Sequence, residues 1–192
     1  MTSPDTSPNA NLDIDFDVDT LSGMVPIRSV VFSIGSNLGD RLSYLQGAVD
    51  ALRMTPNLDL VDVSSVYETD PVGPVSDQPQ FLNAVLRADS TLSSLVLLER
   101  AQAIENNFRR TREVPGGPRT LDVDVIVVGE RVKDSPQLTL PHPRAHERAF
   151  VLVPWLEIDP TATLPERGTV AELLAGLDNT GVRRRDDLSI DV

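Results

Sequence analysis

The chain has 192 residues, of which 40% are hydrophobic, and it carries a formal net charge of −12 and no cysteine. A chain of this length can bury one substantial core, while the lack of cysteine excludes a disulfide framework or a thiolate metal site and favours a cytoplasmic enzyme. The acidic balance argues against nonspecific binding to nucleic acid or anionic membranes, and no apolar run reaches the ~18 residues of a membrane span.

The first 26 residues differ in composition from the rest of the chain. Residues 1–26 contain five Asp and no Lys or Arg, which predicts a disordered acidic tail, although the alternating LDIDFDV segment leaves an edge strand open. We expect no secretory signal, because a basic start and a continuous apolar segment are both missing. A single domain is expected over 27–180, followed by a C-terminal tail over 181–192, in which the arginines at 183–185 are expected to be solvated.

The hydrophobic pattern of the central region predicts alternating strands and helices. Apolar and β-branched runs predict strands at 27–35, 58–69, 81–90 and 119–128. Helical spacing predicts helices from Asp40 to before Pro56, from Ser93 or Ser94 into the arginines at 109–112, at Ala145–Leu156 and at Val170–Leu177. Thr169 and Glu172 have the spacing of a capping box for the last of them.

The order strand, helix, strand, strand, helix, strand is typical of the split βαβ, ferredoxin-like layout. It predicts an α+β fold with one mostly antiparallel sheet and with the helices packed on one face of that sheet.

Two carboxylates interrupt the apolar run GPRTLDVDVIVVG (117–129). Because side chains alternate between the faces of a strand, Asp122 and Asp124 share a face with Ile126 and Val128, and their Cα atoms are about 6–7 Å apart. At an effective dielectric near 20, their repulsion is about 2–3 kcal/mol. Water at a solvated strand end or a divalent cation with oxygen ligands could offset it, and both interpretations stay open at this point.

Four arginines, Arg109, Arg110, Arg112 and Arg119, lie within eleven residues ahead of the carboxylates. A nucleoside triphosphate brings about −4 and the two aspartates −2, so two Mg²⁺ leave about −2 for arginines to neutralise. The run could equally be a solvated helix end. The chain has no G-x-x-x-x-G-K-[ST] motif, so any ATP binding would not use a P-loop.

Four segments occur in an order and spacing that resemble a known family. They are IGSNLGD (34–40), YETDPVGPVSDQPQFLNAV (67–85), GPRTLDVDVI (117–126) and LTLPHPRAHERAFVLVP (138–154). Together they resemble 6-hydroxymethyl-7,8-dihydropterin pyrophosphokinase, the folate-pathway family that transfers pyrophosphate from ATP to the pterin hydroxymethyl group. The resemblance covers about residues 28–178 and leaves the acidic tail outside.

The resemblance implies roles for individual residues. It implies that Asp122 and Asp124 hold two Mg²⁺, and that Asp122 also faces the substrate hydroxyl. The residues it implies on the ATP side are Gln102, Arg110, Arg112, Arg119, Thr139, His142 and Arg148, with Arg110 and Arg119 also catalytic. The residues it implies around the pterin are Thr69, Pro71, Val72, Gly73, Phe81, Asn83, Asp122 and Phe150. A flat ring with polar edges suits two aromatic faces and an amide such as that of Asn83.

The chain departs from the family pattern at two places. Pro115 and Gly116 stand where the family often has a basic residue or a tryptophan, and Gln137 stands where an arginine is common. One cation fewer leaves the two carboxylates unaffected, but it predicts weaker nucleotide binding or a different closing motion.

The resemblance implies an ATP-dependent diphosphotransferase that acts as a monomer on two small-molecule substrates, ATP and hydroxymethyl-dihydropterin. A non-catalytic ligand-binding module on the same layout stays open as the alternative, because one fold can host many functions. A zinc site at His142 and His146 is disfavoured, since two ligands are too few and Pro143 interrupts the helix that would align them.

Overall fold

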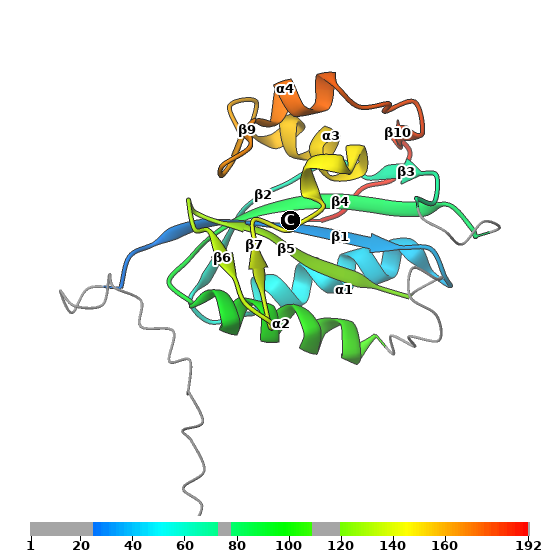
Figure 1. Cartoon of the computed structure of the whole chain (residues 1–192). Coiled ribbons are helices and arrows are strands. Elements are labelled where there is room, and N and C mark those ends of the chain that lie inside the picture. The colour runs from blue at the N-terminus through cyan, green and yellow to red at the C-terminus, as the bar shows by residue number, and fades with distance from the viewer. Residues whose placement is uncertain (1–24, 73–77, 109–119, 192) are drawn as a thin grey trace, which may run out of the picture.

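The computed structural model describes residues 25–72, 78–108 and 120–191 (Figure 1). The expected disorder of residues 1–26 therefore falls almost entirely outside the described part of the chain. Among the described residues, no helix combines the length and the apolar character needed to cross a membrane.

One antiparallel sheet forms the centre of the molecule. Its strands are β1 (Arg28–Ser36), β2 (Leu58–Val63), β3 (Tyr67–Thr69), β4 (Phe81–Ser90), β5 (Asp122–Val128) and β10 (Val182–Arg184). Their order is β10-β3-β4-β1-β5, β2 also pairs with β4, and every pairing in this sheet is antiparallel. The predicted α+β fold with a mostly antiparallel sheet is confirmed.

The remaining elements are short except for two long helices. The helices are α1 (Arg41–Arg53), α2 (Ser94–Asn107), α3 (Ala149–Ile158) and α4 (Val170–Ala175), with a 3₁₀ turn η2 (Ala145–Glu147). Two small antiparallel pairs join β6 (Lys133–Asp134) to β7 (Thr139–Leu140) and β8 (Thr163–Leu164) to β9 (Gly168–Thr169). The predicted strand over 58–69 is split into β2 and β3, whereas 81–90 was predicted with the observed bounds.

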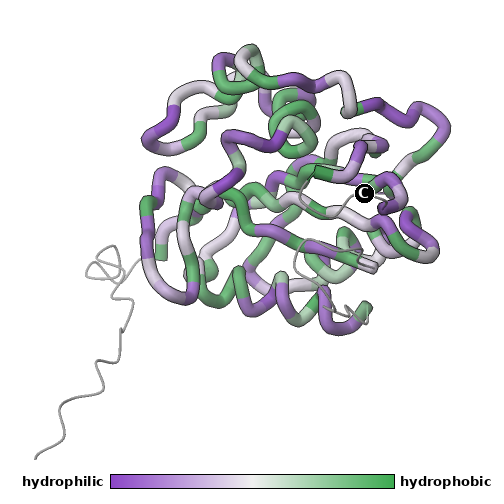
Figure 2. Tube along the Cα trace, turned by 45° about the vertical axis from the view of Figure 1, so that its right-hand side comes forward, coloured by the Kyte–Doolittle hydropathy of each residue, from purple (hydrophilic) through white to green (hydrophobic). Residues whose placement is uncertain are grey.

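Helices cover both faces of the sheet, so the prediction that they pack on one face is wrong (Figure 1). One core cluster joins Phe32 of β1 and Leu86 of β4 to α1 and α2. A second cluster joins Val85 of β4 and Ile126 of β5 to α3, where Trp155 is 2% exposed. Figure 2 shows apolar residues concentrated on the central strands and on the helices packed against them.

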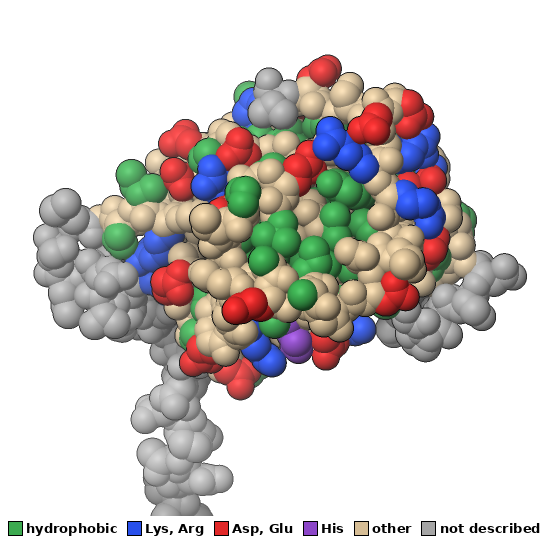
Figure 3. Space-filling view, turned by 90° about the horizontal axis from the view of Figure 1, so that it is seen from above, with side chains coloured by type: hydrophobic (Ala, Val, Ile, Leu, Met, Phe, Trp, Pro, Cys, Tyr) green, Lys and Arg blue, Asp and Glu red, His purple; other side chains and the backbone are tan. Residues whose placement is uncertain are grey.

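The second layer is thin and incomplete. Seen from the side of α3 and α4, hydrophobic side chains remain visible between charged ones (Figure 3). These helices pack on the half of the sheet that contains Val31, Val85 and Ile126. On this face, side chains at the beginnings of β4 and β5 line a cavity beside α3.

A β-bulge in β5 interrupts the regular alternation of side chains that was predicted for this strand. The register with β1 shifts between Val31 and Phe32, so that Val127 pairs with Val31 and Val125 pairs with Phe32. Ile126 is the extra residue, and beyond it the faces are exchanged: Val127 joins the cluster under α3 and Val128 joins the opposite cluster. The prediction that Val128 shares the face of the two aspartates is therefore wrong.

The expected C-terminal tail contains an edge strand. Val182–Arg184 form β10, which pairs antiparallel with β3. Arg183 and Arg184 are exposed, as predicted, and Arg184 and Arg185 pair with the adjacent Asp186 and Asp187. The prediction missed the long-range pairs, in which Arg183 contacts Asp70 and Arg185 contacts Glu68. The expected boundary between the domain and the tail at residue 180 stays a prediction.

The capping box at α4 gives a direct test of a local prediction. The Thr169 side chain accepts the N–H of Glu172, and the Glu172 carboxylate accepts the N–H of Thr169. We expect Thr169→Ala to lower the free energy of unfolding by about 0.5–2 kcal/mol in urea denaturation. The matched control is Thr163→Ala, at the exposed threonine that faces Thr169 across the β8–β9 pair but caps no helix. An equal loss in both variants would contradict the role of the cap.

Tyr67 gives a pH-dependent test. Burial, together with the Glu157 carboxylate that accepts its hydroxyl at 3.1 Å, raises the pKa of Tyr67 from 10.0 to about 12. Because the folded pKa is the higher one, this stabilisation is complete below pH 10 and is lost as the pH rises toward 12. We expect Tyr67→Phe to show a shallower fall of unfolding free energy across this range. Identical slopes for the two proteins would contradict the assignment.

Candidate active site

Residues of β1, β4 and β5 form the floor of a cavity, and two segments form its walls. The floor residues are Ser33, Gly35, Phe81, Asn83, Asp122 and Asp124, the residues beside β3 are Thr69, Asp70, Val72 and Gln78, and the residues around η2 and α3 are Arg144, Arg148 and Phe150. The predicted positions thus brought together are Thr69, Val72, Phe81, Asn83, Asp122, Asp124, Arg148 and Phe150.

Strand register explains why the two predicted halves of the site are adjacent. Gly35 of β1 pairs with Asn83 on one side and with Asp122 on the other. Ser33 pairs with Asp124. An amide and two carboxylates therefore lie on neighbouring strands and face one cavity, separated by a residue without a side chain.

Gly35 makes room for the Asn83 side chain. A Cβ atom at position 35 would lie 2.5 Å from Asn83 Oδ1. Asn83 is 4% exposed, and its Nδ2 donates to Thr69 Oγ1 at 2.6 Å. The amide is thereby held in one orientation on a side chain that lines the cavity.

Asp124 is the electrostatic centre of the site. Burial, and next the negative charge of Asp122, raise the pKa of the Asp124 carboxyl above its ordinary value. Arg148 and His142 oppose this shift: Arg148 Nη1 donates to Asp124 Oδ2 at 3.0 Å, and His142 Nε2 lies 3.9 Å from the same oxygen. Positive charge placed here would stabilise the ionised form of Asp124.

His142 faces this carboxylate from the segment that follows β7. Burial lowers the pKa of His142, and this effect exceeds the opposing attraction of Asp124. The His142 Nδ1 accepts the N–H of Arg144 at 3.2 Å, so a neutral ring would carry its proton on Nε2, the nitrogen that lies 3.9 Å from Asp124 Oδ2. The His142 N–H also donates to the carbonyl of Ile126 at 2.8 Å, which fixes this segment beside β5.

Arg148 lies between the Asp124 carboxylate and an aromatic ring. Its guanidinium carbon lies 5.5 Å from the centroid of the Phe150 ring, while its Nη1 contacts Asp124. Phe150 and Phe81 both line the cavity, one from α3 and one from β4. A flat ligand between them would meet an aromatic face on each side and the Asn83 amide at its edge.

Glu105 of α2 supports the strand that carries both aspartates. β5 is the last strand in the sheet order, with β1 as its neighbour. The Val123 N–H, located between the two aspartates, donates to Glu105 Oε1 at 2.9 Å, and Glu105 is 4% exposed. A buried carboxylate of α2 thus holds the backbone of this edge strand.

Other predicted residues lie outside the cavity or outside the described structure. Arg110, Arg112, Arg119 and Gly73 fall in the ranges that are not described. Gln102 is exposed on α2, Thr139 is half-buried on β7, and neither Thr139 nor Pro71 is among the residues that line the cavity. His142 contacts Asp124 from its rim.

Five cavity residues were not predicted: Ser33, Gly35, Asp70, Gln78 and Arg144. All except Ser33 lie within the four segments that resemble the family. The resemblance of these segments could therefore have indicated that the four residues are near the site. Within the described ranges, no three His, Asp or Glu side chains gather as a metal site. The donors for a cation here are the two carboxylates of β5.

Comparison with known proteins decides the family. The family model for 7,8-dihydro-6-hydroxymethylpterin-pyrophosphokinase (HPPK) matches residues 31–160. The chain belongs to the HPPK family. The 2-amino-4-hydroxy-6-hydroxymethyldihydropteridine pyrophosphokinase of Pseudomonas aeruginosa is 42% identical over 158 residues, which cover 82% of this chain and 97% of the relative. The Mycobacterium leprae protein of the same name is 48% identical over 171 residues, 80% and 87% of the two chains.

Solved structures show the same HPPK fold. Plasmodium falciparum HPPK-DHPS, crystallised with pterin and p-hydroxybenzoate, superposes with a TM-score of 0.62 at 14% identity. The match covers 81% of this chain and 44% of that chain, so this HPPK chain spans less than half the length of that solved protein. At this identity the likeness supports the fold alone, which agrees with the antiparallel sheet and packed helices described above.

Proposed function

We propose that this chain transfers pyrophosphate from ATP to the hydroxymethyl group of 6-hydroxymethyl-7,8-dihydropterin, with release of AMP. Family membership supports this activity. The observation that carries the proposal is the pairing of Gly35 in β1 with Asn83 in β4 and with Asp122 in β5. This register places the Asn83 amide, which suits the polar edge of a heterocycle, close to a pair of carboxylates.

The pterin lies between Phe81 and Phe150, with its polar edge on the Asn83 amide. Thr69 and Val72 form the wall beside it, and Pro71 and Gly73 complete that wall in the family pattern. Both phenylalanines line the cavity, and the fixed orientation of Asn83 supports a preformed polar contact. In this arrangement the hydroxymethyl group points from the amide toward Asp122.

The residues present fit a divalent cation. Two carboxylates share one cavity, and burial together with the charge of Asp122 raises the pKa of Asp124, so a cation bound there would favour its ionised form. Asp122 and Asp124 would hold two Mg²⁺, which supply charge neutralisation between the triphosphate and the carboxylates when bound. Arg148 sits beside them as a cation for the phosphates, and the nucleotide-side roles of Gln102, Arg110, Arg112, Arg119, Thr139 and His142 stay predictions.

The reaction is an in-line displacement. The substrate hydroxyl oxygen forms a bond to the β-phosphorus, the bond from that phosphorus to the α–β bridging oxygen breaks, AMP leaves, and the hydroxyl proton is released. Asp122 orients the hydroxyl, and Arg148 offsets negative charge at the phosphates. The chain's contribution is mainly position and electrostatics. The monomeric state and the cytoplasmic location stay predictions.

The test is AMP release from ATP, measured with and without hydroxymethyl-dihydropterin and with and without Mg²⁺. We expect release to require both the pterin and the metal. Release without pterin would contradict the proposed acceptor, and no release at all would favour the competing hypothesis of a non-catalytic ligand-binding module.

A further inference from the structure

The C-terminal segment reaches back to the wall of the cavity. β10 pairs antiparallel with β3, with Val182 opposite Thr69 and Arg183 opposite Glu68. The residues of this C-terminal clamp, as we name it here, are Gly181, Arg183 and Arg185. They lie beyond residues 31–160, the part of the chain that matches the family model.

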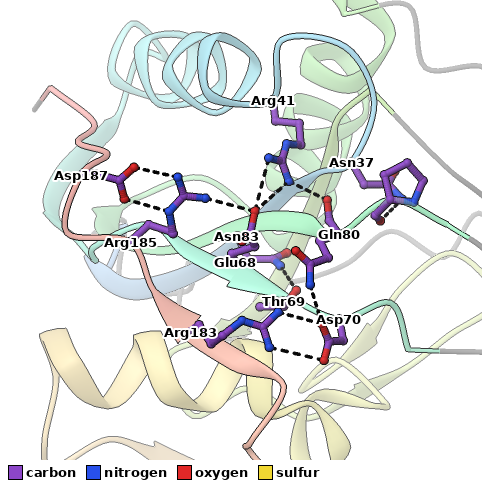
Figure 4. Close-up of polar contacts among 11 residues, drawn as sticks. Asn37, Arg41, Glu68, Thr69, Asp70, Gln80, Asn83, Arg183, Arg185 and Asp187 are labelled. Atoms are coloured by element: carbon purple, nitrogen blue, oxygen red, sulfur yellow. Dashed lines mark hydrogen bonds and ion pairs between the residues drawn. The ribbon is translucent and has the colours of Figure 1, made fainter.

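Asp70 is the point at which the clamp meets the cavity. Asp70 donates its N–H to the Gly181 carbonyl at 3.1 Å. Its carboxylate accepts two contacts from Arg183, at 2.8 and 3.5 Å, and a third from Gln80 Nε2 at 2.9 Å (Figure 4). Since Asp70 follows β3 and Gln80 precedes β4, this carboxylate ties both ends of the intervening loop to β10.

A second carboxylate, Glu68, reinforces the same region. Arg185 Nη1 lies 3.1 Å and Arg41 Nη1 lies 3.3 Å from Glu68 Oε1 (Figure 4). Arg41 Nη1 also donates to the Gln80 carbonyl at 2.8 Å. Each end of the loop is therefore held by an arginine from another part of the chain.

The clamp is connected to the ligand-facing groups through β3. Thr69, between Glu68 and Asp70, accepts the Asn83 amide at 2.6 Å and lines the cavity, as does Asp70. Arg183 is absent from the residues that line it. Resting on the proposed function, we infer that Arg183 is a positioning residue for pterin binding, which acts through Asp70 on the wall formed by Thr69 and Val72.

The charges of this pair persist at neutral pH. The hydrogen bond from Arg183, and next that from Gln80, lower the pKa of Asp70 below its ordinary value. The ion pair lies at the surface, with 44% of the Arg183 side chain and 53% of the Asp70 side chain exposed. Surface pairs contribute modestly, so the expected change in pterin affinity is between about two- and five-fold.

The experiment compares Arg183→Ala with Arg184→Ala in the full-length chain. Arg184 is the next residue of the same edge strand, but it pairs with Glu157 and Asp186 rather than with Asp70. We expect Arg183→Ala to raise the KM and the Kd for hydroxymethyl-dihydropterin about two- to five-fold, with kcat and the KM for ATP within about two-fold of the starting protein. We expect Arg184→Ala to leave all four unchanged.

Two further variants separate positioning from general stability. Arg183→Lys should restore part of the affinity, and adding Arg183→Ala to Asp70→Asn should cost no more than Asp70→Asn alone, because the two residues act as a pair. Unchanged pterin KM and Kd in Arg183→Ala, or an equal rise in Arg184→Ala, would overturn the inference. If Arg183→Ala does not fold, the pterin KM and Kd of Arg183→Lys and of Asp70→Asn are compared with those of Arg184→Ala instead. A starting protein without pterin-dependent AMP release would instead refute the proposed function.

Discussion

Asp122→Asn is expected to reduce turnover by about 10²–10³-fold, since metal-assisted neutralisation of phosphoryl charge supplies several kcal/mol of transition-state stabilisation. The substitution keeps the size of the side chain and removes its charge. The fold should persist, because the charge of Asp122 contributes to the unfavourable ionisation of Asp124 and its removal relieves that repulsion. The measurement is steady-state AMP release, with thermal unfolding in parallel.

The control for this prediction is Asp89→Asn. Asp89 is an exposed carboxylate near the end of β4, six residues after Asn83 on the same strand, a separation of about 20 Å in an extended chain. Its replacement should leave turnover within about two-fold of the starting protein, as for surface substitutions in general. Turnover of Asp122→Asn close to that of Asp89→Asn would exclude the carboxylate pair as the catalytic centre. Loss of folding in Asp122→Asn would show a structural role in its place.

Gly35→Ala is expected to weaken pterin binding by about 10- to 100-fold, the equivalent of one or two lost hydrogen bonds to buried groups. The added Cβ would lie 2.5 Å from Asn83 Oδ1, and the amide would have to move away from Thr69 or from the cavity. Equilibrium binding of hydroxymethyl-dihydropterin measures the effect, because it does not depend on the chemical step.

Gly176→Ala is the matched control for Gly35→Ala. A Cβ at position 176 would meet the Leu173 carbonyl oxygen at an ordinary 3.6 Å, and Gly176 ends α4 away from the cavity. Its pterin affinity should stay within about two-fold of the starting protein. Unaltered binding in Gly35→Ala would contradict the assignment of Asn83 as the polar contact of the pterin.

Local sequence signals predicted much of the fold because they act over a few residues. Thr169 caps its helix as expected, Ser93 is the one of the two candidates that caps α2, and the apolar run of β4 has the predicted bounds. The β10 strand could not be found in this way, because Arg183 and Arg184 carry no apolar alternation. Long-range ion pairs and backbone pairing with β3 determine its position.

The second helical layer was missed for a related reason. Helical periodicity identifies α3, but the side of the sheet on which a helix packs depends on the direction of the chain after β7. The bulge at Ile126 is likewise invisible in a run of β-branched residues, since Val125, Val127 and Val128 are equally suited to either face. Alternation alone therefore placed Val128 on the wrong face.

The predicted site residues that line the cavity are side chains to which the family resemblance gave a direct contact with a ligand. Phe81, Asn83, Asp122, Asp124, Arg148 and Phe150 do line one cavity. Gly35 and Asp70 were missed, because the importance of Gly35 lies in the space it leaves and that of Asp70 in a partner located 113 residues away in the chain. Neither property can be seen in a residue type.

The location of the two aspartates on the last strand has a consequence for amide exchange with solvent deuterium. β5 has a hydrogen-bonded neighbour on one side, β1, and Glu105 accepts its Val123 amide on the other. A nucleotide and a pterin that bridge Asp122, Arg148 and Asn83 would fasten this outer strand to the interior of the sheet. Binding of both ligands should then slow deuterium uptake along β5. We expect this decrease in the uptake rate to be far larger at β5 than at β2, so that β5 would report ligand binding.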